Sequence, residues 1–414
     1  MPDRFADPTE ADPQGTDAGP RMWSPWRAVV GFGVISLAAD MVYEGARSVY
    51  GPLLASLGAS ALVVGAVTGA GEAAALIFRI VSGPLADRTG RYWTLTIAGY
   101  ALTAVCVPLL AITPLLGGAG LAVAAALIMA ERIGKAIRSP AKSTLLADSA
   151  AQVGMGRGLG VHKALDQIGA FAGPLLVAGL VAATGALSPG LAALALPGAV
   201  AMFLLVVTRR RLPAPAAPTG PADAAPTADA GDHRTRLPSS FIRFAVGTAA
   251  CTAGLVTFGL ISFHLVERDL VPTAAVPLLY AGAMAAAALA ALGTGEAYDR
   301  LGPRVLLFLP MLVAGIPALA FSDSLGLVVS GVLLWGAAVG VQDSTVKALV
   351  ADLVPRERRA TAYGVFAALQ GAGALLGGVA AGALYQHSVT ALIVVAVVVQ
   401  AAALLILLPV VRRS

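Results

Sequence analysis

Long apolar stretches separated by short polar turns alternate along almost the whole of this 414-residue chain. Each stretch is long enough for a helix to cross the hydrocarbon core of a bilayer, which is about 30 Å thick and needs about 20 residues. The pattern predicts an all-α integral membrane protein with twelve transmembrane helices. The expected spans lie near 27–52, 61–83, 93–114, 119–142, 158–184, 189–208, 240–266, 273–294, 303–322, 325–350, 360–385 and 388–411.

Two stretches interrupt this pattern. Residues 1–22 are acidic, contain proline and show no basic region or cleavage site before an apolar run, so they are typical of a disordered tail and not of a signal peptide. Residues 209–239 are rich in Pro, Ala and Asp without periodicity, which favours a flexible linker. The remaining chain divides into two expected six-helix bundles, at 23–208 and 240–414.

Composition and charge fit a membrane protein. Hydrophobic residues make up 57% of the chain and charged residues only 12%. Arginines concentrate after even-numbered spans and at the C-terminus, whereas the opposite loops carry only Arg268. By the positive-inside rule both termini should be cytoplasmic, and a plasma (inner) membrane is the expected location. The net charge of +5 then reflects topology and does not indicate nucleic-acid binding.

A charged turn after the second span recurs in the second half. The sequence GPLADRTGR at 83–91 is echoed by GEAYDRLGPR at 295–304, with Asp87 and Asp299 offset by 212 positions. Such a turn cannot lie in hydrocarbon, so it must cap two helices at one membrane face. A second match has an offset of 204. It relates Ala147-Asp148 to Ala351-Asp352, Gly169 to Gly373 and Gly173 to Gly377. These matches predict two homologous halves.

The first turn resembles the loop 2–3 signature of the major facilitator superfamily, and Gly169, Gly173, Pro174 and Gly179 resemble the Gly-Pro pattern of its antiporter members. This resemblance covers all twelve spans. It implies two pseudo-symmetric bundles, a central cavity lined by spans 1, 4, 7 and 10, and a monomer. The expected gate residues at the cytoplasmic face are Gly83, Asp87, Arg88, Gly90, Arg91, Asp148, Asp299 and Arg300.

The carboxylate of Asp87 could meet Arg88 or Arg91 and the positive N-terminal end of a neighbouring helix, such as span 11. Contacts of this kind would hold the cytoplasmic side closed. By the resemblance, Asp148 would belong to the same cluster.

Charges inside the spans are costly and are therefore functional candidates. Asp40, Glu44 and Arg47 follow a spacing of four and three, and Glu131, Lys135, Arg138 and Lys142 a spacing of four, three and four, so each set forms a stripe on one helical face. At the offset of 204, the charges of span 4 face uncharged residues, so the shared scaffold does not need them. We expect Asp40, Glu44 and Glu131 to bind protons. The expected cavity residues are Arg47, Arg132, Lys135, Arg138, Lys163, Asp166, Tyr280, Trp335, Gln342, Asp343 and Lys347.

These features predict a secondary transporter that exports a small organic compound in exchange for protons, driven by the proton gradient. Transport of an anionic metabolite, by exchange or symport, is an alternative that the basic residues of span 4 favour. A membrane scaffold or sensor is a further alternative. The sequence has no metal-ligand spacing, nucleophile elbow or phosphate-binding loop, so neither an enzyme nor a bound metal or cofactor is expected. The expected partners are the small-molecule substrate, protons and the lipid bilayer.

Overall fold

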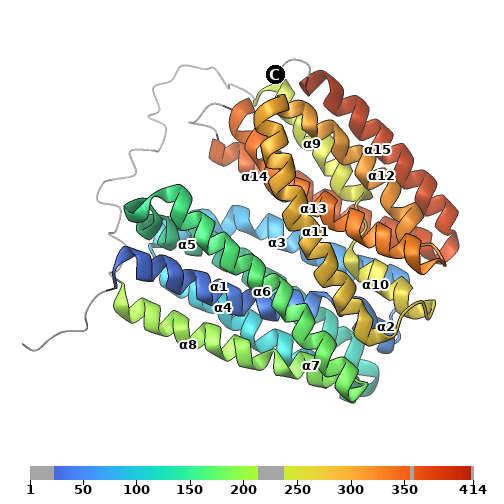
Figure 1. The fold of residues 1–414 in the computed structure, drawn as a ribbon, viewed down its shortest axis with the longest axis horizontal. Helices are drawn as coiled ribbons and strands as arrows, with labels where there is room; N and C mark the ends of the chain where they lie inside the picture. Colours follow the sequence, from blue (N-terminus) through green and yellow to red (C-terminus); the bar gives the residue numbers. More distant parts are fainter. Residues whose placement is uncertain (1–22, 213–236, 355–358, 412–414) are drawn as a thin grey trace, which may run out of the picture.

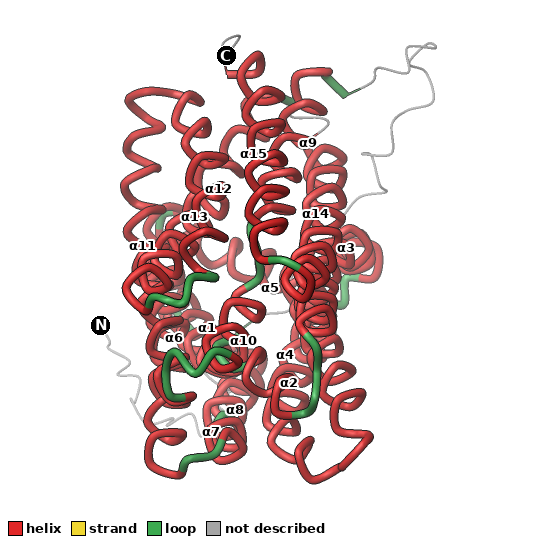
Figure 2. Tube along the Cα trace, turned by 90° about the vertical axis from the view of Figure 1, so that its right-hand side faces the viewer, coloured by secondary structure: helices red, strands yellow, loops and turns green. Residues whose placement is uncertain are grey.

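A computed structural model describes residues 23–212, 237–354 and 359–411 of the chain. The described segments are helices joined by short loops (Figure 2). The first half contains α1 (Pro25–Arg47), α2 (Tyr50–Ser56), α3 (Ala61–Thr89), α4 (Tyr92–Leu109), η1 (Leu110–Ala119), α5 (Gly120–Val153), α6 (Met155–Thr184), α7 (Leu187–Ala193) and α8 (Ala195–Arg211). The second half contains α9 (Ser239–Gly254), α10 (Phe258–Glu267), η2 (Thr273–Ala275), α11 (Val276–Leu301), η3 (Gly302–Leu307), α12 (Phe308–Ala320), α13 (Leu325–Leu353), α14 (Arg359–His387) and α15 (Val389–Val411).

These helices account for twelve membrane passes within the described residues. Ten helical stretches are long and apolar enough to cross a bilayer, and two of them, of 62 and 48 residues, are too long for a single crossing. Each contains a break at a glycine with positive φ, at Gly117 (φ 53°) and Gly302 (φ 66°), and each supplies two passes. The all-α, twelve-span fold expected from the sequence is therefore confirmed. The expected tail (1–22) and most of the expected linker lie outside the described residues.

The first and seventh spans are broken, whereas the sequence predicts continuous helices there. The first changes direction between α1 and α2, where Val49 has φ −120° and ψ 10° and the Ser48 hydroxyl donates to the Gly45 carbonyl. The seventh breaks between Gly254 and Phe258. The indole N–H of Trp335 donates to the carbonyl of Val256 at 2.8 Å, which satisfies a backbone group that the break frees.

The sequence repeat corresponds to equivalent packing in the two halves. A Cβ on Gly169 or Gly173 would overlap the carbonyl groups of Leu37 and Met41, so α6 lies directly on the backbone of α1. Their repeat partners make the same close contact: a Cβ on Gly373 or Gly377 of α14 would overlap the carbonyl groups of Ala249 and Ala253 in α9. Leu37 and Met41 are offset from Ala249 and Ala253 by 212 positions, the offset of the opening spans. The glycines permit the same close helix pair twice.

The two bundles meet at one end and diverge at the other (Figure 1). We call the end where α1 and α9 begin and α8 and α15 end the linker end, and the opposite end, with α2, α7 and α10, the far end. At the far end the backbones touch, since a Cβ on Gly51 would overlap α10 and one on Gly65 would overlap the carbonyl of Gly378 in α14. Toward the linker end α3 and α14 approach each other less closely, since a Cβ on Gly364 would have no neighbour nearer than Ile80, at 3.9 Å.

Candidate functional site

A cavity of about 470 Å³ lies between the two bundles. Its walls come from α1, α3, α4, α5 and α6 on one side and from α9, α11, α13 and α14 on the other. Ten of the residues expected from the sequence line it: Asp40, Glu44, Arg47, Lys135, Arg138, Lys163, Asp166, Trp335, Gln342 and Asp343. The charged stripe of the first span and the Lys135, Arg138 and Lys142 part of the fourth-span stripe therefore face one shared space.

Glu72 of α3 is the centre of an ion-pair network in the N-terminal wall. Its Oε1 lies 2.7 Å from Arg47 Nη2 and 3.4 Å from Arg132 Nη1. Arg47 Nη1 lies 3.6 Å from Glu44 Oε2, and Arg132 Nε lies 3.6 Å from Glu131 Oε2. One carboxylate thus joins α1 to α5, and each of its two arginines contacts a second carboxylate.

The ring of Tyr43, on α1, contacts two cations of α5, Arg132 and Lys135. Arg132 donates a hydrogen bond to the Tyr43 hydroxyl and places Cζ 4.6 Å from the ring centroid. Lys135 places Nζ only 3.5 Å from the same centroid. Cation–π attraction strengthens in a desolvated site, so this tyrosine holds both side chains in place without neutralising either.

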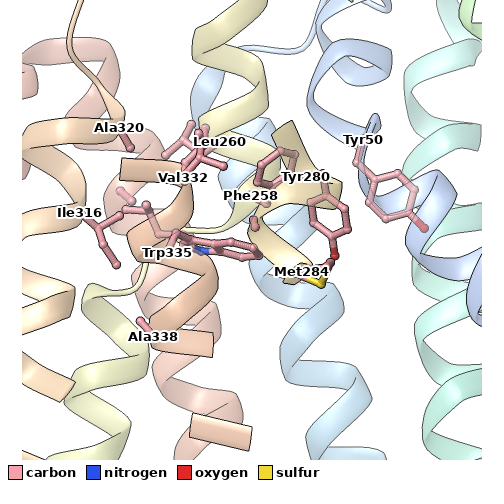
Figure 3. Close-up of a cluster of buried hydrophobic side chains, with 14 of the residues drawn as sticks. Tyr50, Phe258, Leu260, Tyr280, Met284, Ile316, Ala320, Val332, Trp335 and Ala338 are labelled. Atoms are coloured by element: carbon pink, nitrogen blue, oxygen red, sulfur yellow. The ribbon is translucent and has the colours of Figure 1, made fainter. Parts of the chain in front are cut away.

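Glu44 also contacts the C-terminal bundle, where the Tyr280 hydroxyl donates to its carboxylate. Tyr280 packs edge-on against Phe258 with centroids 4.6 Å apart, and Phe258 lies 5.5 Å from Trp335 (Figure 3). Arg47 Cζ lies 5.9 Å from the Trp335 ring. A buried aromatic cluster therefore closes the cavity on its far-end side, and the carboxylate that reaches it belongs to the opposite bundle.

A second carboxyl site lies in the N-terminal wall. Asp166 Oδ2 of α6 is 2.8 Å from Lys163 Nζ. Asp40 of α1 lines the same cavity and is an electrostatic neighbour of Asp166. Two neighbouring carboxylates repel each other, so a proton on one of them stabilises the pair.

Four cavity cations have no carboxylate within ion-pair distance among the described residues: Arg79, Lys135, Arg138 and Lys142. Lys142 donates to Ser36 at 2.9 Å, and Ser36 also contacts His162 Nε2 at 3.0 Å. Arg138 donates to Thr103 and stacks over Tyr100 at 4.6 Å. Within the part of the chain that the structure describes, the buried Arg79 Nε and, in the opposite wall, the buried Gln342 Nε2 have no hydrogen-bond partner. Each bundle therefore contributes to the cavity wall a residue with an unsatisfied hydrogen-bond donor.

Three expected site residues lie behind the cavity wall. Glu131, Arg132 and Tyr280 are at most 2% exposed and support residues that line the cavity. The side chain of Lys347 lies outside the described residues. Glu72 and Arg79 also line the cavity. The sequence marks them as functional candidates, because it places two charges inside the second span, seven residues apart on one helical face.

The expected gate residues lie at the linker end, where Asp87, Arg88, Arg91 and Asp148 are exposed. Asp87 accepts a hydrogen bond from Tyr92 at 3.1 Å, and no ion pair among the described residues includes it. Gly90 ends α3 with φ 61°, a conformation that favours glycine, and a Cβ on Gly83 would lie 3.8 Å from the side chain of Pro140. In the second copy, the exposed Arg300 pairs with Glu296, and Asp299 is exposed.

Comparison with known proteins places this architecture among transporters. The chain is 51% identical over 375 residues to the uncharacterized protein Rv2265 of Mycobacterium tuberculosis and equally to the uncharacterized protein Mb2288 of Mycobacterium bovis, with 90% of each chain covered. The nucleoside transporter NupG has the same fold (TM-score 0.72, 15% identity, 92% of this chain and 99% of that one). So does a POT family transporter solved with 5-aminolevulinic acid (TM-score 0.73, 12% identity, 93% and 95%).

The family match extends over nearly the whole described chain, in two overlapping parts that together cover both bundles. The matched residues are 32–276 and 249–414. Together with the twelve spans and the internal repeat, the match shows that this chain is a member of the Major Facilitator Superfamily.

Proposed function

We propose that this protein is a proton-coupled secondary transporter that exports a small organic compound by rocking its two bundles around the central cavity. The observation that carries the proposal is the cavity itself: it holds titratable side chains within the spans, and it lies between two bundles whose backbones touch at the far end and diverge toward the linker end (Figure 1). A cavity between two repeats near the middle of the membrane is the arrangement that alternating access requires.

The linker end carries the arginine-rich turns, so we assign it to the cytoplasm. The conformation described here is then open to the cytoplasm. A bacterial homologue of the lysosomal transporter Spinster, solved in an inward-facing and unoccupied conformation, has a similar arrangement (TM-score 0.62, 14% identity, 94% of this chain and 95% of that chain). In this assignment the Asp87 region is the side that closes in the next step of the cycle.

Proton coupling is assigned to two carboxyl sites. The Asp40–Asp166 pair would hold one proton between its two carboxyl groups, and Lys163 and Lys142 lie close enough to favour its loss. Glu44 would be the second site, because protonating it weakens its attraction to Arg47 and changes its contact with Tyr280 in the other bundle. Glu131 stays a candidate that would act from behind the wall, through Arg132.

The charge of the substrate decides whether proton coupling gives antiport or symport. A cationic compound competes with protons for Asp40, Glu44 and Asp166, which gives antiport. An anionic compound, favoured by the four cavity cations without an ion-paired carboxylate, binds better after protonation, which gives symport. We keep the anionic compound as a second candidate because of these cations.

The test measures the pH gradient of energised inside-out vesicles during additions of lipophilic cations, neutral antibiotics and organic anions. In the antiport case an exported compound dissipates the gradient in the wild type, and Asp40→Asn, Asp166→Asn and Glu44→Gln abolish this response. Glu296→Gln, which changes an exposed carboxylate, should respond like the wild type. Proton coupling fails if the three cavity variants behave like the wild type.

The same vesicles separate the two substrate classes. An anionic substrate requires Lys135 and Lys142, so Lys135→Ala and Lys142→Ala should each weaken transport by about tenfold, the effect of a contact worth about 1.4 kcal/mol. Undiminished transport in both variants overturns the anionic candidate and leaves the cationic or neutral compound.

A further inference from the structure

A second cavity lies on the outer surface of the N-terminal bundle, at the linker end between α1 and α8. Its volume is about 460 Å³. None of its residues lines the central cavity. It is lined by Trp23, Trp26, Arg27, Val30, Gly31, Val34, Leu204 and Thr208. We call this cavity the α1–α8 groove.

The groove is held in shape by the backbone. The N–H of Trp23 donates to the carbonyl of Arg211 at 3.0 Å, which ties the residues before α1 to the last turn of α8. The indole of Trp23 lies on Gly31, where a Cβ would overlap the ring. Trp26 and Val30 are both 43% exposed, so the apolar lining lies on the outer surface of the bundle. On a membrane-spanning bundle, such a surface favours a lipid-like neighbour.

Basic side chains occupy the parts of α1 and α8 that lie nearest the linker end, and one of them, Arg27, lines the groove. Arg27 belongs to the first turn of α1, and Arg209 and Arg210 belong to the last turn of α8. All three are exposed, and none takes part in an ion pair within the described residues. From Arg27 to Val34 the helix rises about 10 Å, at 1.5 Å per residue, so a charged rim continues directly into an apolar floor.

We propose that the α1–α8 groove binds an anionic glycerophospholipid, with an acyl chain along Val30, Val34 and Leu204 and the phosphate beside Arg27, at the membrane level of Arg209 and Arg210 in the last turn of α8. Tryptophans are typical of the level where lipid headgroups meet acyl chains. Basic side chains near the membrane surface each attract anionic lipid by about 1 kcal/mol. Charge complementarity therefore selects an anionic over a zwitterionic lipid. The proposal does not depend on what the central cavity transports.

The groove contains two of the four tryptophans of the chain, which gives a direct experiment. The full-length protein is placed in phosphatidylcholine nanodiscs containing equal small fractions of either dibrominated phosphatidylglycerol or dibrominated phosphatidylcholine, because bromine quenches tryptophan on contact. Trp93 and Trp335 are only 8% and 2% exposed, so the signal comes mainly from the groove. We expect several-fold stronger quenching by the brominated phosphatidylglycerol.

Two sets of variants test the assignment. Arg27→Gln/Arg209→Gln/Arg210→Gln should abolish the preference for phosphatidylglycerol while leaving the quenching by phosphatidylcholine, and Trp23→Phe/Trp26→Phe should remove the excess quenching. Arg243→Gln/Arg304→Gln, which changes exposed arginines elsewhere, should keep the preference. Equal quenching by the two lipids in the wild type, or a preference that survives the triple substitution, overturns the proposal.

Discussion

The hydroxyl group of Tyr280, in the C-terminal bundle, donates a hydrogen bond to the carboxylate of Glu44, in the N-terminal bundle. This bond crosses the interface at the point where the central cavity ends and the closed far end begins. Near it, the Thr68 and Thr257 hydroxyls form a second bond between the bundles, at 2.8 Å. Glu44 also contacts Arg47, so its charge state affects both the contact between bundles and the ion pairs of the cavity.

Tyr280→Phe should shift the protein toward a conformation that is open at the far end. The variant keeps the ring that packs against Phe258 and loses only the hydrogen bond to a charged group, which is worth about 1.5–3 kcal/mol. The open population should therefore rise by about tenfold or more. The measurement is the rate at which a water-soluble maleimide labels Ser262→Cys, a buried position beside Gly51, in a background with Cys106→Ala and Cys251→Ala.

Tyr385→Phe is the matched control for this experiment. Its hydroxyl bonds to His264 Nδ1 at 2.7 Å, also near the far end but within one bundle. It should leave the labelling rate unchanged. Equal rates in Tyr280→Phe and the unmodified background would show that the Glu44 contact does not hold the far end closed.

Glu72→Gln should lower the stability of the folded protein. The carboxylate of Glu72 lies against both Arg47 and Arg132, so its removal leaves two cations poorly compensated in a buried wall. Removing one partner of a buried ion pair costs about 3–5 kcal/mol, and the partial exposure of Glu72 places the effect at the lower end, about 3 kcal/mol. The measurement is the Tm of the purified protein in detergent, which should fall by several degrees.

Glu296→Gln provides the comparison for Glu72→Gln. Its partner is Arg300, and the two side chains are 67% and 75% exposed, so the pair contributes about 0–1 kcal/mol. Its Tm should match the wild type. If the two variants have the same Tm, then Glu72 does not stabilise the N-terminal wall.

The sequence predicted the architecture because the architecture depends on local patterns. Span length, the positions of polar turns and the repeat offsets all follow from neighbouring residues, and the offset that pairs Gly169 with Gly373 identified positions that pack alike in space. The charged stripes of α1 and α5 were likewise predictable, since helical spacing alone puts Asp40 and Glu44 on one face.

The partners of those charges could not be predicted from helical spacing. Glu44 bonds to Tyr280, 236 positions away, and Glu72 links Arg47 to Arg132, so each contact depends on how separate helices pack. Sequence reasoning assigned Tyr280 to the cavity wall as an aromatic residue, although it lies behind the wall. The breaks after Arg47 and Gly254 also depend on tertiary contacts, such as the bond from Trp335 to Val256.

Asp40→Asn and Asp166→Asn should each remove the same bound proton. The two carboxyl groups are neighbours in the cavity wall, so we expect them to hold one proton between them, and the double variant should lose no more protons than either single variant. The measurement is the number of protons that the purified protein releases, followed with an indicator dye in weakly buffered detergent solution as base is added. Each variant should release about one proton fewer than the wild type. A double variant that loses two protons would show two independent sites.

Gly173→Ala should weaken the contact between α1 and α6, whereas Gly179→Ala in the same helix should not. A Cβ on Gly173 would overlap the carbonyl group of Met41, and overpacking of this kind typically costs about 1–3 kcal/mol. A Cβ on Gly179 would meet nothing within 4 Å. Alanine also has the higher helix propensity, so Gly179→Ala should leave the Tm unchanged or raise it. Because the repeat places Gly377 on Ala253 in the same way, Gly377→Ala should lower the Tm as Gly173→Ala does. A Tm that falls in one half only would mean that the two helix pairs do not contribute equally to stability, despite their equivalent geometry.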